Sequence, residues 1–468
     1  MSRDAVIESL EHYFDDGGFW TDLARRVAIR SCSQDEPFRP ELYRYLKEEM
    51  TPYLADLGFV SEIFENPKPG GQPILVARRQ EGDDLPTLMT YGHGDVVRGY
   101  DDQWRDGIGP WEMKKVGDRW YGRGTADNKG QHTINLAALK ACMDARGGKL
   151  GYNVVALIET GEETGSPGLR EFCRAHSDLF KADVFIASDG PRLNALRPTV
   201  YFGSRGVFNF TMSLDLRDGG HHSGNWGGLL ANPGIILASA LATVIDVKGR
   251  ILVPALLPPP ITDTVKGLLA DVTRETSTGG PAIDDDWGEP GLTRAEKVYA
   301  WNTFEILAMK TGNPDNPVHA VPPKAVAHCQ LRFVVGTDWQ NIVANLQAHL
   351  DAAGFGIVKV QPSTGGNAAF FHAARTDPDH PWARWMRAAV ERTTGERCRM
   401  VPNSGGSICN DVFQDVLGIP FVWLPLSYTG CSQHAPNEHI LWSLTREGME
   451  LVTGVYWDLG DPETRYAA

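Results

Sequence analysis

Short motifs rich in acidic residues and histidine stand where apolar runs of this chain end, and they constrain its fold more than any other feature. They are YGHGD with His93 and Asp95, GRGTADNKG with Asp127, GEETGS with Glu162 and Glu163, ASDG with Asp189, and SQHAPNE with His434. In open α/β sheets, ligand-binding side chains collect at the carboxyl ends of strands. We therefore expect these side chains to meet at one edge of a sheet.

The residue types in these motifs indicate metal chemistry. Together they offer two imidazoles and three carboxylates as ligands, and a further carboxylate remains to move a proton. Two zinc ions that share one bridging carboxylate, with a base beside them, would use such a set. The motifs as a set therefore predict a metal-dependent hydrolase.

Taken singly, each motif also has an ordinary structural explanation. Asp95 can fix the tautomer of the preceding histidine, but most such triplets occur by chance. Glu162 and Glu163 could simply complement the dipole of a following helix. Lys129 in GRGTADNKG suggests a phosphate loop, but the GxxxxGK[ST] spacing is missing and Asp127 would repel phosphate. The hydrolase prediction thus depends on the joint pattern.

Apolar strands alternate with amphipathic helices along the first part of the chain, which predicts an α/β fold with a mixed sheet and helices on both faces. From about residue 206 the pattern changes to that of an inserted α+β unit. The expected helices cover residues 4–31, 38–58, 130–145, 168–176, 233–247, 339–353 and 441–457. The expected strands cover residues 74–78, 88–91, 154–158, 184–187, 200–202, 208–216, 326–335, 357–360 and 422–424.

The positions of the two histidines imply a discontinuous domain. His93 precedes the insertion and His434 follows it. If both bind one pair of metals, the C-terminal segment must return to the N-terminal sheet. We therefore predict a catalytic domain made of residues 1–205 and 363–468, interrupted by a second domain of residues 206–362.

Size and composition narrow the class of protein. A chain of 468 residues is long enough for two domains. Its formal charge of −14 argues against nucleic acid or an anionic membrane as a partner, since either favours a basic face. The seven cysteines are scattered without a CxxC pair, and no apolar run is long enough to span a membrane. We therefore expect a cytoplasmic protein.

In their order along nearly the whole chain, the motifs HGD, GRGTADNKG, GEETGS, ASDG, HHSGNWGG and HAPNE resemble those of a family of dizinc metallopeptidases and deacylases. That family includes aminoacylase, carnosinase, acetylornithine deacetylase and glutamate carboxypeptidase. The resemblance implies one zinc held by His93, Asp127 and Asp189. It implies a second zinc held by Asp127, Glu163 and His434, so that Asp127 bridges the ions, and a cis peptide bond after Asp127.

The resemblance also assigns catalytic roles. Glu162 matches the general base, and Asp95 matches the carboxylate that supports the metal-binding histidine. The inserted unit resembles a lid that carries dimerisation. Its His222, in HHSGNWGG, would reach the active site of the partner subunit in a homodimer and stabilise the developing oxyanion.

Three further residues are implied in substrate binding. Arg332, in HAVPPKAVAHCQLR, would grip the substrate carboxylate, with His319 as a weaker polar contact. An exposed strand residue is the structural alternative for Arg332. Ser407, in the NSGGSI loop, would contact the same carboxylate.

The expected activity is hydrolysis of the amide bond of dipeptides or similar small substrates with a free carboxylate, by water activated at two zinc ions. Manganese or cobalt also suits a ligand set of this kind. An N-acyl-amino-acid deacylase that removes acetyl, succinyl or carbamoyl groups would use the same site. A non-catalytic binding homologue is the remaining alternative, which the spare base Glu162 disfavours.

Overall fold

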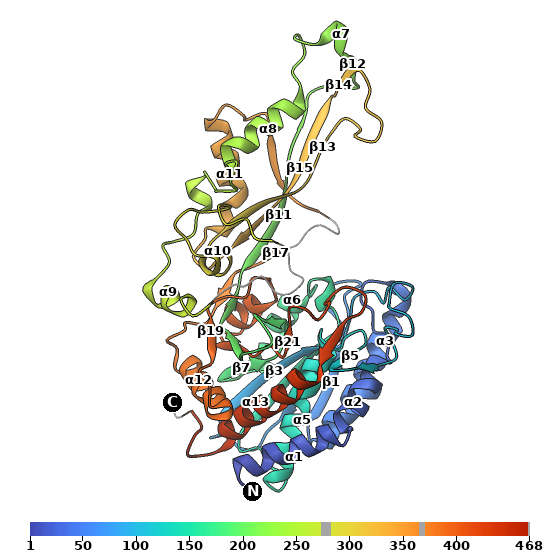
Figure 1. Ribbon diagram of the computed structural model, residues 1–468, viewed down its shortest axis with the longest axis vertical. Coiled ribbons are helices and arrows are strands. Elements are labelled where there is room, and N and C mark those ends of the chain that lie inside the picture. The colour runs from blue at the N-terminus through green and yellow to red at the C-terminus, as the bar shows by residue number, and fades with distance from the viewer. Residues whose placement is uncertain (273–281, 365–369, 467–468) are drawn as a thin grey trace.

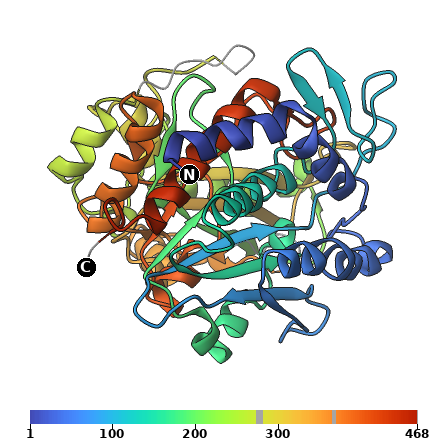
Figure 2. The same ribbon diagram turned by 90° about the horizontal axis from the view of Figure 1, so that it is seen from below.

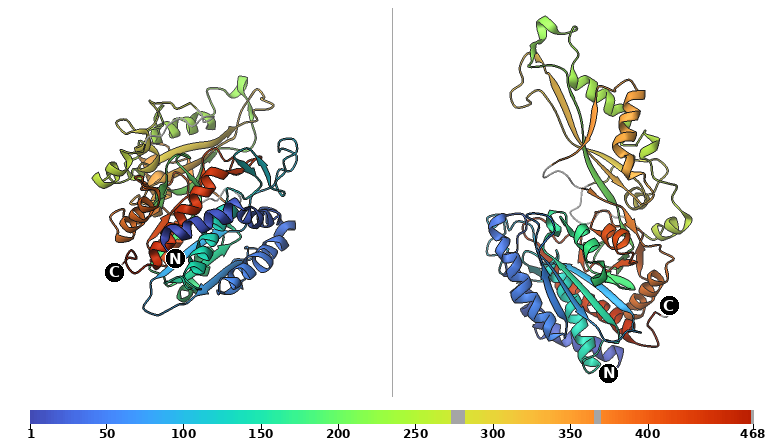
Figure 3. Two further views of the ribbon diagram at one scale, coloured as in Figure 1. Left: turned by 60° about the horizontal axis from the view of Figure 1, so that its bottom comes forward. Right: turned by 180° about the vertical axis from the view of Figure 1, so that it is seen from behind.

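The computed structural model describes residues 1–272, 282–364 and 370–466. A layered α/β unit contains both ends of the chain, and a narrower unit built from the middle of the chain extends from it (Figures 1 and 3). The predicted class, a mixed sheet with an inserted α+β unit, is confirmed.

An eight-stranded mixed sheet forms the centre of the α/β unit. In spatial order its strands are β1 (Val60–Phe64), β2 (Ile74–Arg79), β6 (Asn153–Glu159), β3 (Thr87–His93), β7 (Val184–Ala187), β20 (Phe421–Trp423), β9 (Thr199–Tyr201) and β19 (Arg399–Val401). Neighbours among β6, β3, β7 and β20 are parallel, whereas β2 is antiparallel to β6 and β20 is antiparallel to β9. Since β19 and β20 come from the C-terminal segment, the strands that complete this sheet follow the second unit in the sequence.

Helices cover both faces of this sheet (Figure 2). Successive residues of a strand point to opposite faces, so Leu75 and Ala77 join one core while Ile74 and Val76 join the other. One face packs against α1 (Arg3–Asp15), α2 (Gly18–Val27), α5 (Lys129–Ala145), α12 (Pro381–Thr394) and α13 (Trp442–Gly460). The other packs against α6 (Leu169–Ala175), η8 (Val412–Val416), α9 (Asp263–Leu269) and α10 (Arg294–Tyr299).

The N-terminal helices differ in two respects from the expectation, since α2 ends at Val27 and not at residue 31. The helix expected over residues 4–31 is divided into α1 and α2, because Gly17 has a left-handed φ of 85° between them. The next segment is helical as expected, through α3 (Arg39–Arg44), η2 (Tyr45–Met50) and α4 (Thr51–Asp56).

The second unit is built on an antiparallel sheet. Its strands, in spatial order, are β13 (Thr303–Thr311), β15 (Lys324–Phe333), β11 (Gly206–Asp215) and β16 (Lys359–Pro362), with β17 (Phe370–Phe371) also paired to β11. Helices α8 (Pro233–Val244) and α11 (Ile342–Ala352) pack on one face through a core that includes Phe210 and Leu346. At the far end, α7 (Ser223–Trp226), β12 (His221–His222) and β14 (Ala320–Val321) form the tip (Figure 1).

Short strand pairs connect distant segments near the carboxyl ends of the central strands. A three-stranded sheet has the order β22 (His439–Leu441), β5 (Arg119–Tyr121) and β4 (Lys114–Val116). Two further pairs are β21 (Ser427–Tyr428) with β8 (Pro191–Arg192), and β10 (Gly203–Ser204) with β18 (Ala374–Arg375).

None of the helices in the described ranges has both the length and the apolar character that crossing a membrane requires.

Candidate metal centre

Three neighbouring parallel strands bring candidate ligands to one edge of the central sheet. His93 is the last residue of β3, Glu162 and Glu163 follow β6, and Asp189 follows β7. Because β6, β3 and β7 are parallel neighbours, their carboxyl ends coincide in space. This part of the sequence-based expectation is confirmed.

Asp127 and His434 reach the same place from loops. Asp127 lies in the turn before α5, and its peptide bond to Asn128 is cis. The pairing of β22 with β5 brings the loop of His434 beside this turn. His93 Nε2 is 3.0 Å from Asp127 Oδ1, and His434 Nε2 is 2.9 Å from Asp127 Oδ2. Glu163 Oε2 is 3.0 Å from the same atom of His434.

The five side chains form two overlapping groups. Ligand atoms of His93, Asp127 and Asp189 lie within 4.8 Å of one another, and so do those of Asp127, Glu163 and His434. Asp127 belongs to both groups. The structure thus brings together the side chains that the sequence resemblance implies as ligands.

Burial and crowding shift the pKa values in this cluster. Burial raises the pKa of Glu163 to about 7 and that of Asp189 to about 6, and the Asp127 carboxylate adds to both shifts. For Asp127 itself, hydrogen bonds from His434 and His93 outweigh burial and hold the pKa well below its usual range. Hydrogen bonds to Asp127 and Glu163 raise the pKa of His434 to about 11.

These donors fit two divalent cations. Glu163 Oε1 is buried and has no hydrogen-bond partner among the described residues. Asp189 Oδ2 lies 3.8 Å from His93 Nε2, too far for a hydrogen bond. Crowded carboxylates repel one another unless a cation or a proton lies between them, and imidazole and carboxylate groups are zinc ligands. One group would hold one ion, and the group with His434 would hold the other.

Asp95 fixes the orientation of the strand-end residues. Its backbone carbonyl oxygen lies 3.1 Å from His93 Nδ1, and its carboxylate Oδ1 lies 3.3 Å from the same atom. The carboxylate also accepts the backbone N–H groups of Glu162, at 3.2 Å, and Glu163, at 3.1 Å. A donor at Nδ1 leaves Nε2 of His93 free to bind a cation. Asp95 thus contacts His93, Glu162 and Glu163 and belongs to neither metal-ligand group.

Lys129 has a structural role. Its ammonium group donates to the backbone carbonyl oxygens of Arg26, at 3.0 Å, and Ile29, at 2.7 Å. Burial lowers its pKa to about 7. The phosphate-loop alternative therefore has no support, because this lysine is occupied inside the protein.

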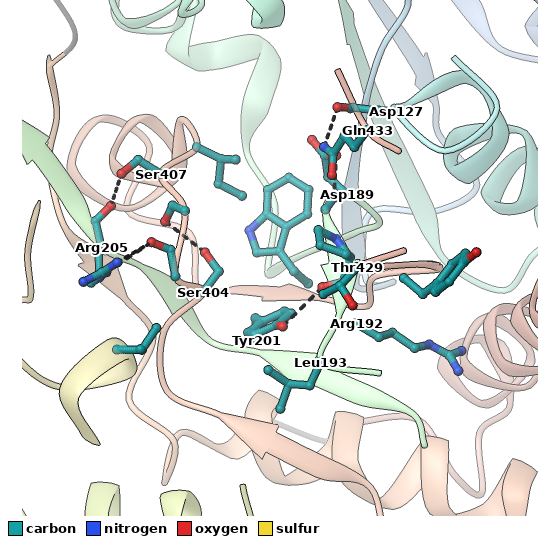
Figure 4. A pocket seen from close by; sticks show the side chains of 18 of the residues that line it. Asp127, Asp189, Arg192, Leu193, Tyr201, Arg205, Ser404, Ser407, Thr429 and Gln433 are labelled. Atoms are coloured by element: carbon teal, nitrogen blue, oxygen red, sulfur yellow. Dashed lines mark hydrogen bonds between the residues drawn. The ribbon is translucent and has the colours of Figure 1, made fainter. Parts of the chain in front are cut away.

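A cavity of about 1030 Å³ begins at the acidic cluster (Figure 4). Asp127, Asp189 and Gln433 lie at one end of it, and Ser404, Ser407 and Arg205 lie at the other. At this second end, Arg332 Nη1 donates to Ser407 Oγ at 2.9 Å, and Ser407 Oγ donates to the carbonyl oxygen of Arg205 at 2.6 Å. Arg332 and Ser407, both singled out in the sequence, therefore share the cavity with the metal-ligand groups.

Sequence reasoning gave no role to three other residues near this cavity. The side-chain amide of Gln433 donates to Asp127 (Figure 4). The guanidinium of Arg205 donates twice to the carbonyl oxygen of Gly405, at 3.1 and 2.9 Å, and so holds the loop of Ser407. Glu438, the last residue of HAPNE, accepts the backbone N–H of Asp127 at 3.0 Å. These residues could not be identified from the sequence, because their hydrogen-bond partners, Asp127 and Gly405, are distant along the chain.

His222 and His319 lie at the tip of the second unit, away from the cavity of their own chain. β12 pairs with β14, and the backbone N–H of Ser223 donates to the carbonyl oxygen of His319 at 2.9 Å. β15 lies between this tip and Arg332, and ten strand residues span roughly 30 Å. Within one chain, neither histidine can contact a substrate held at Arg332.

Comparisons with known proteins agree with this geometry. The model of the family described as Peptidase family M20/M25/M40 matches residues 89–457. The Beta-Ala-His dipeptidase of Mus musculus is 31% identical over 94% of this chain and 92% of its own length. The Cys-Gly metallodipeptidase DUG1 of Candida albicans is 30% identical, over 89% and 90%. The solved structure of human carnosine dipeptidase 1 matches with a TM-score of 0.77 and 23% identity over 98% of this chain and 99% of its own, which shows a shared fold.

Binding of a divalent cation to the metal-free protein should release protons. A ligating imidazole must be neutral, whereas a pKa of about 11 keeps His434 protonated at neutral pH. Metal affinity should therefore increase with pH until the solution passes that pKa. Calorimetry in buffers of different ionisation enthalpy counts the protons released per ion.

The variant His434→Gln isolates the contribution of this residue. Loss of the imidazole should weaken binding of the ion at the group formed with Asp127 and Glu163, whereas His12→Gln, on an exposed part of α1, should change nothing. Unchanged cation affinity in His434→Gln would contradict the ligand role.

Proposed function

Since the chain belongs to peptidase family M20/M25/M40, we propose that it hydrolyses the peptide bond of dipeptides with the help of two divalent cations. Its relatives in Mus musculus and Candida albicans are named as dipeptidases, which favours this activity over the deacylase alternative. One observation carries the proposal. A single cavity has two metal-ligand groups at one end and the Arg332–Ser407 pair at the other.

The reaction needs an activated water and a base. Two bound cations would supply Lewis acidity, which lowers the pKa of water enough for attack at neutral pH. Glu162 lines the cavity at this end, and burial raises its pKa well above the usual range, with Asp189 adding to the shift. Its carboxylate takes a proton as the water oxygen bonds to the peptide carbonyl carbon. As the C–N bond breaks, Glu162 returns the proton to the leaving amine.

The other end of the cavity would hold the free carboxylate of the substrate. The guanidinium of Arg332 is fixed by Ser407 and can form a charge-assisted pair with a carboxylate. Burial lowers the pKa of Arg332, which nevertheless remains a cation because arginine titrates far above neutrality. A substrate anchored there and cut at the acidic cluster would span this cavity.

The nature of the metal follows from ligand chemistry. Two imidazoles and three carboxylates suit zinc, and oxygen-rich sites also accept manganese or cobalt. We assign zinc as the physiological ion.

We also place the enzyme in the cytoplasm. All seven cysteines are buried free thiols, as expected for a reducing compartment.

We further propose a homodimer formed through residues 206–362, which would act as a lid and dimerisation domain. In the described part of the chain, the edge strand β13 pairs with β15 alone. It exposes Ile306, Leu307 and Met309, and an unpaired edge with apolar side chains favours pairing with another chain. In such a dimer, His222 would serve the cavity of the partner subunit and donate to the oxyanion, with His319 beside it.

Glu162→Gln should keep both cations and lose turnover. Removal of a general base typically lowers the rate about 100- to 10,000-fold. Metal content is measured by mass spectrometry, and activity is measured after reconstitution with zinc, manganese or cobalt. The substrates are dipeptides and N-acetyl, N-succinyl and N-carbamoyl amino acids.

Glu171→Gln, on the exposed side of α6, is the matched control and should retain activity. Near-normal turnover of Glu162→Gln would remove this residue as the base. A wild-type enzyme that prefers the N-acyl amino acids would contradict the dipeptidase proposal.

Arg332→Met should lower kcat/KM for dipeptides by about 10- to 100-fold, because one charged hydrogen-bond partner is lost while the aliphatic volume is retained. For substrates with an amidated C-terminus, the wild type and the variant should be equally slow. Arg375→Met is the control, since Arg375 is partly buried but is not among the residues that line the cavity. An equal loss on free and amidated dipeptides would exclude carboxylate binding by Arg332.

Leu307→Lys should separate the subunits and reduce activity. Leu307 is 55% exposed in the middle of β13, and a lysine there opposes edge-to-edge pairing. Sedimentation should show a monomer, and kcat should fall about 100- to 1000-fold if His222 is the missing oxyanion donor. The control is Val60→Lys, because Val60 is 77% exposed on β1, the edge of the central sheet.

Mixing two inactive variants tests the contribution across subunits. In a dimer of Glu162→Gln with His222→Ala, one of the two sites receives an intact base and an intact histidine. Activity should therefore return on mixing. Two variants that stay inactive when mixed, although they form mixed dimers, would show that His222 acts elsewhere.

A further inference from the structure

Glu438 joins the two loops that carry Asp127 and His434. Its side chain is 1% exposed, and Oε1 accepts the backbone N–H groups of Ala126, at 2.9 Å, and Asp127, at 3.0 Å. The N–H of Gly124 lies 3.1 Å from both carboxylate oxygens. Because Glu438 follows His434 by four residues, it links one ligand loop to the backbone of the other.

The loop that carries His434 has a strained backbone. Ser432, His434 and Asn437 have φ values of 57°, 60° and 66°, a region that L side chains rarely adopt. The side chain of His434 is more than half exposed, so packing does not fix its position. Strain of this kind persists only where surrounding contacts impose it.

Arg123 fixes Glu438 in the protein. Its Nη1 donates to Glu438 Oε2 at 2.8 Å, and both side chains are fully enclosed. Its Nε and Nη2 have no hydrogen-bond partner among the described residues, although the guanidinium lies 5.7 Å from the ring of Trp104. Loss of one member of a buried ion pair is strongly unfavourable, because the other charge stays unpaired. The carboxylate of Glu438 is therefore held in place without any bound cation.

We propose that Glu438 is a positioning residue for the metal centre, an inference that rests on the function proposed above. It holds the backbone of Asp127 and the strained loop of His434 at the separation that two cations require, before either cation binds. Outer contacts of this kind fix ligands in many metal sites, and their loss lowers metal affinity by about 10- to 100-fold.

The test measures metal binding directly. Glu438→Gln removes the charge but leaves Arg123 unpaired, so the double variant Glu438→Gln/Arg123→Gln is made in parallel to remove the buried cation as well. Metal-free wild type and both variants are titrated with Zn²⁺ and Co²⁺, and binding is followed by calorimetry, mass spectrometry and the absorption of bound Co²⁺. For each metal, the more weakly bound of the two ions should bind about 10- to 100-fold less tightly to both variants than to the wild type.

Glu81 provides a matched control near the start of β6, at the end of the strands opposite to the candidate metal centre. It accepts the backbone N–H groups of Leu150, at 2.8 Å, and Gly151, at 2.9 Å, and pairs with Arg79 at 2.8 Å. Glu81→Gln should lower the melting temperature and leave metal affinity unchanged. Unchanged affinity in Glu438→Gln, or an equal loss in Glu81→Gln, would overturn the positioning role. A wild type that does not bind two ions would instead contradict the proposed function.

Discussion

Negative charge gathered at one edge of the central sheet is the constraint on which the rest of the structure depends. Carboxylates from two strand ends, those of Glu163 and Asp189, lie within 4.8 Å of the carboxylate or histidine atoms grouped with them around Asp127, in a largely buried position. Burial, with the nearby Asp127 carboxylate adding to it, raises the pKa of Glu163 and of Asp189, so ionising these two groups without a cation costs free energy. Cations bound between these carboxylates would offset that unfavourable free energy, so metal binding and the stability of the folded state are coupled.

The meeting of the candidate ligand residues and the type of fold could be predicted because both leave local marks in the sequence. His93 ends one apolar strand and Asp189 follows another, and the strand–helix alternation gives the mixed sheet. The helix expected over residues 4–31 was wrong in its continuity, since one left-handed glycine, Gly17, divides it, and in its end, since α2 stops at Val27. The role of Glu438 could not be found in the same way, because Asp127, its partner, is 311 residues away.

Packing between distant segments explains why the sequence did not predict the placement of α9 and α10 or the contacts that form the cavity. α9 and α10 lie inside residues 206–362, yet their apolar side chains join the core of the central sheet. Hydrophobic periodicity reports that a helix has an apolar face and does not report which sheet it covers. The same holds for the cavity, where Arg332 of the second unit donates to Ser407 of the α/β unit. This hydrogen bond couples the position of the second unit to the geometry of that end of the cavity.

The place of β20 in the sheet has a consequence for biosynthesis. β20 lies between β7 and β9, two strands made more than 200 residues earlier, and His434 follows it. A nascent chain that has left the ribosome only as far as β9 has a sheet with an unfilled position and lacks one imidazole ligand. Of the two candidate ligand groups, the one that includes His434 can therefore be completed only when translation is nearly finished, whereas His93, Asp127 and Asp189 are made before the second unit.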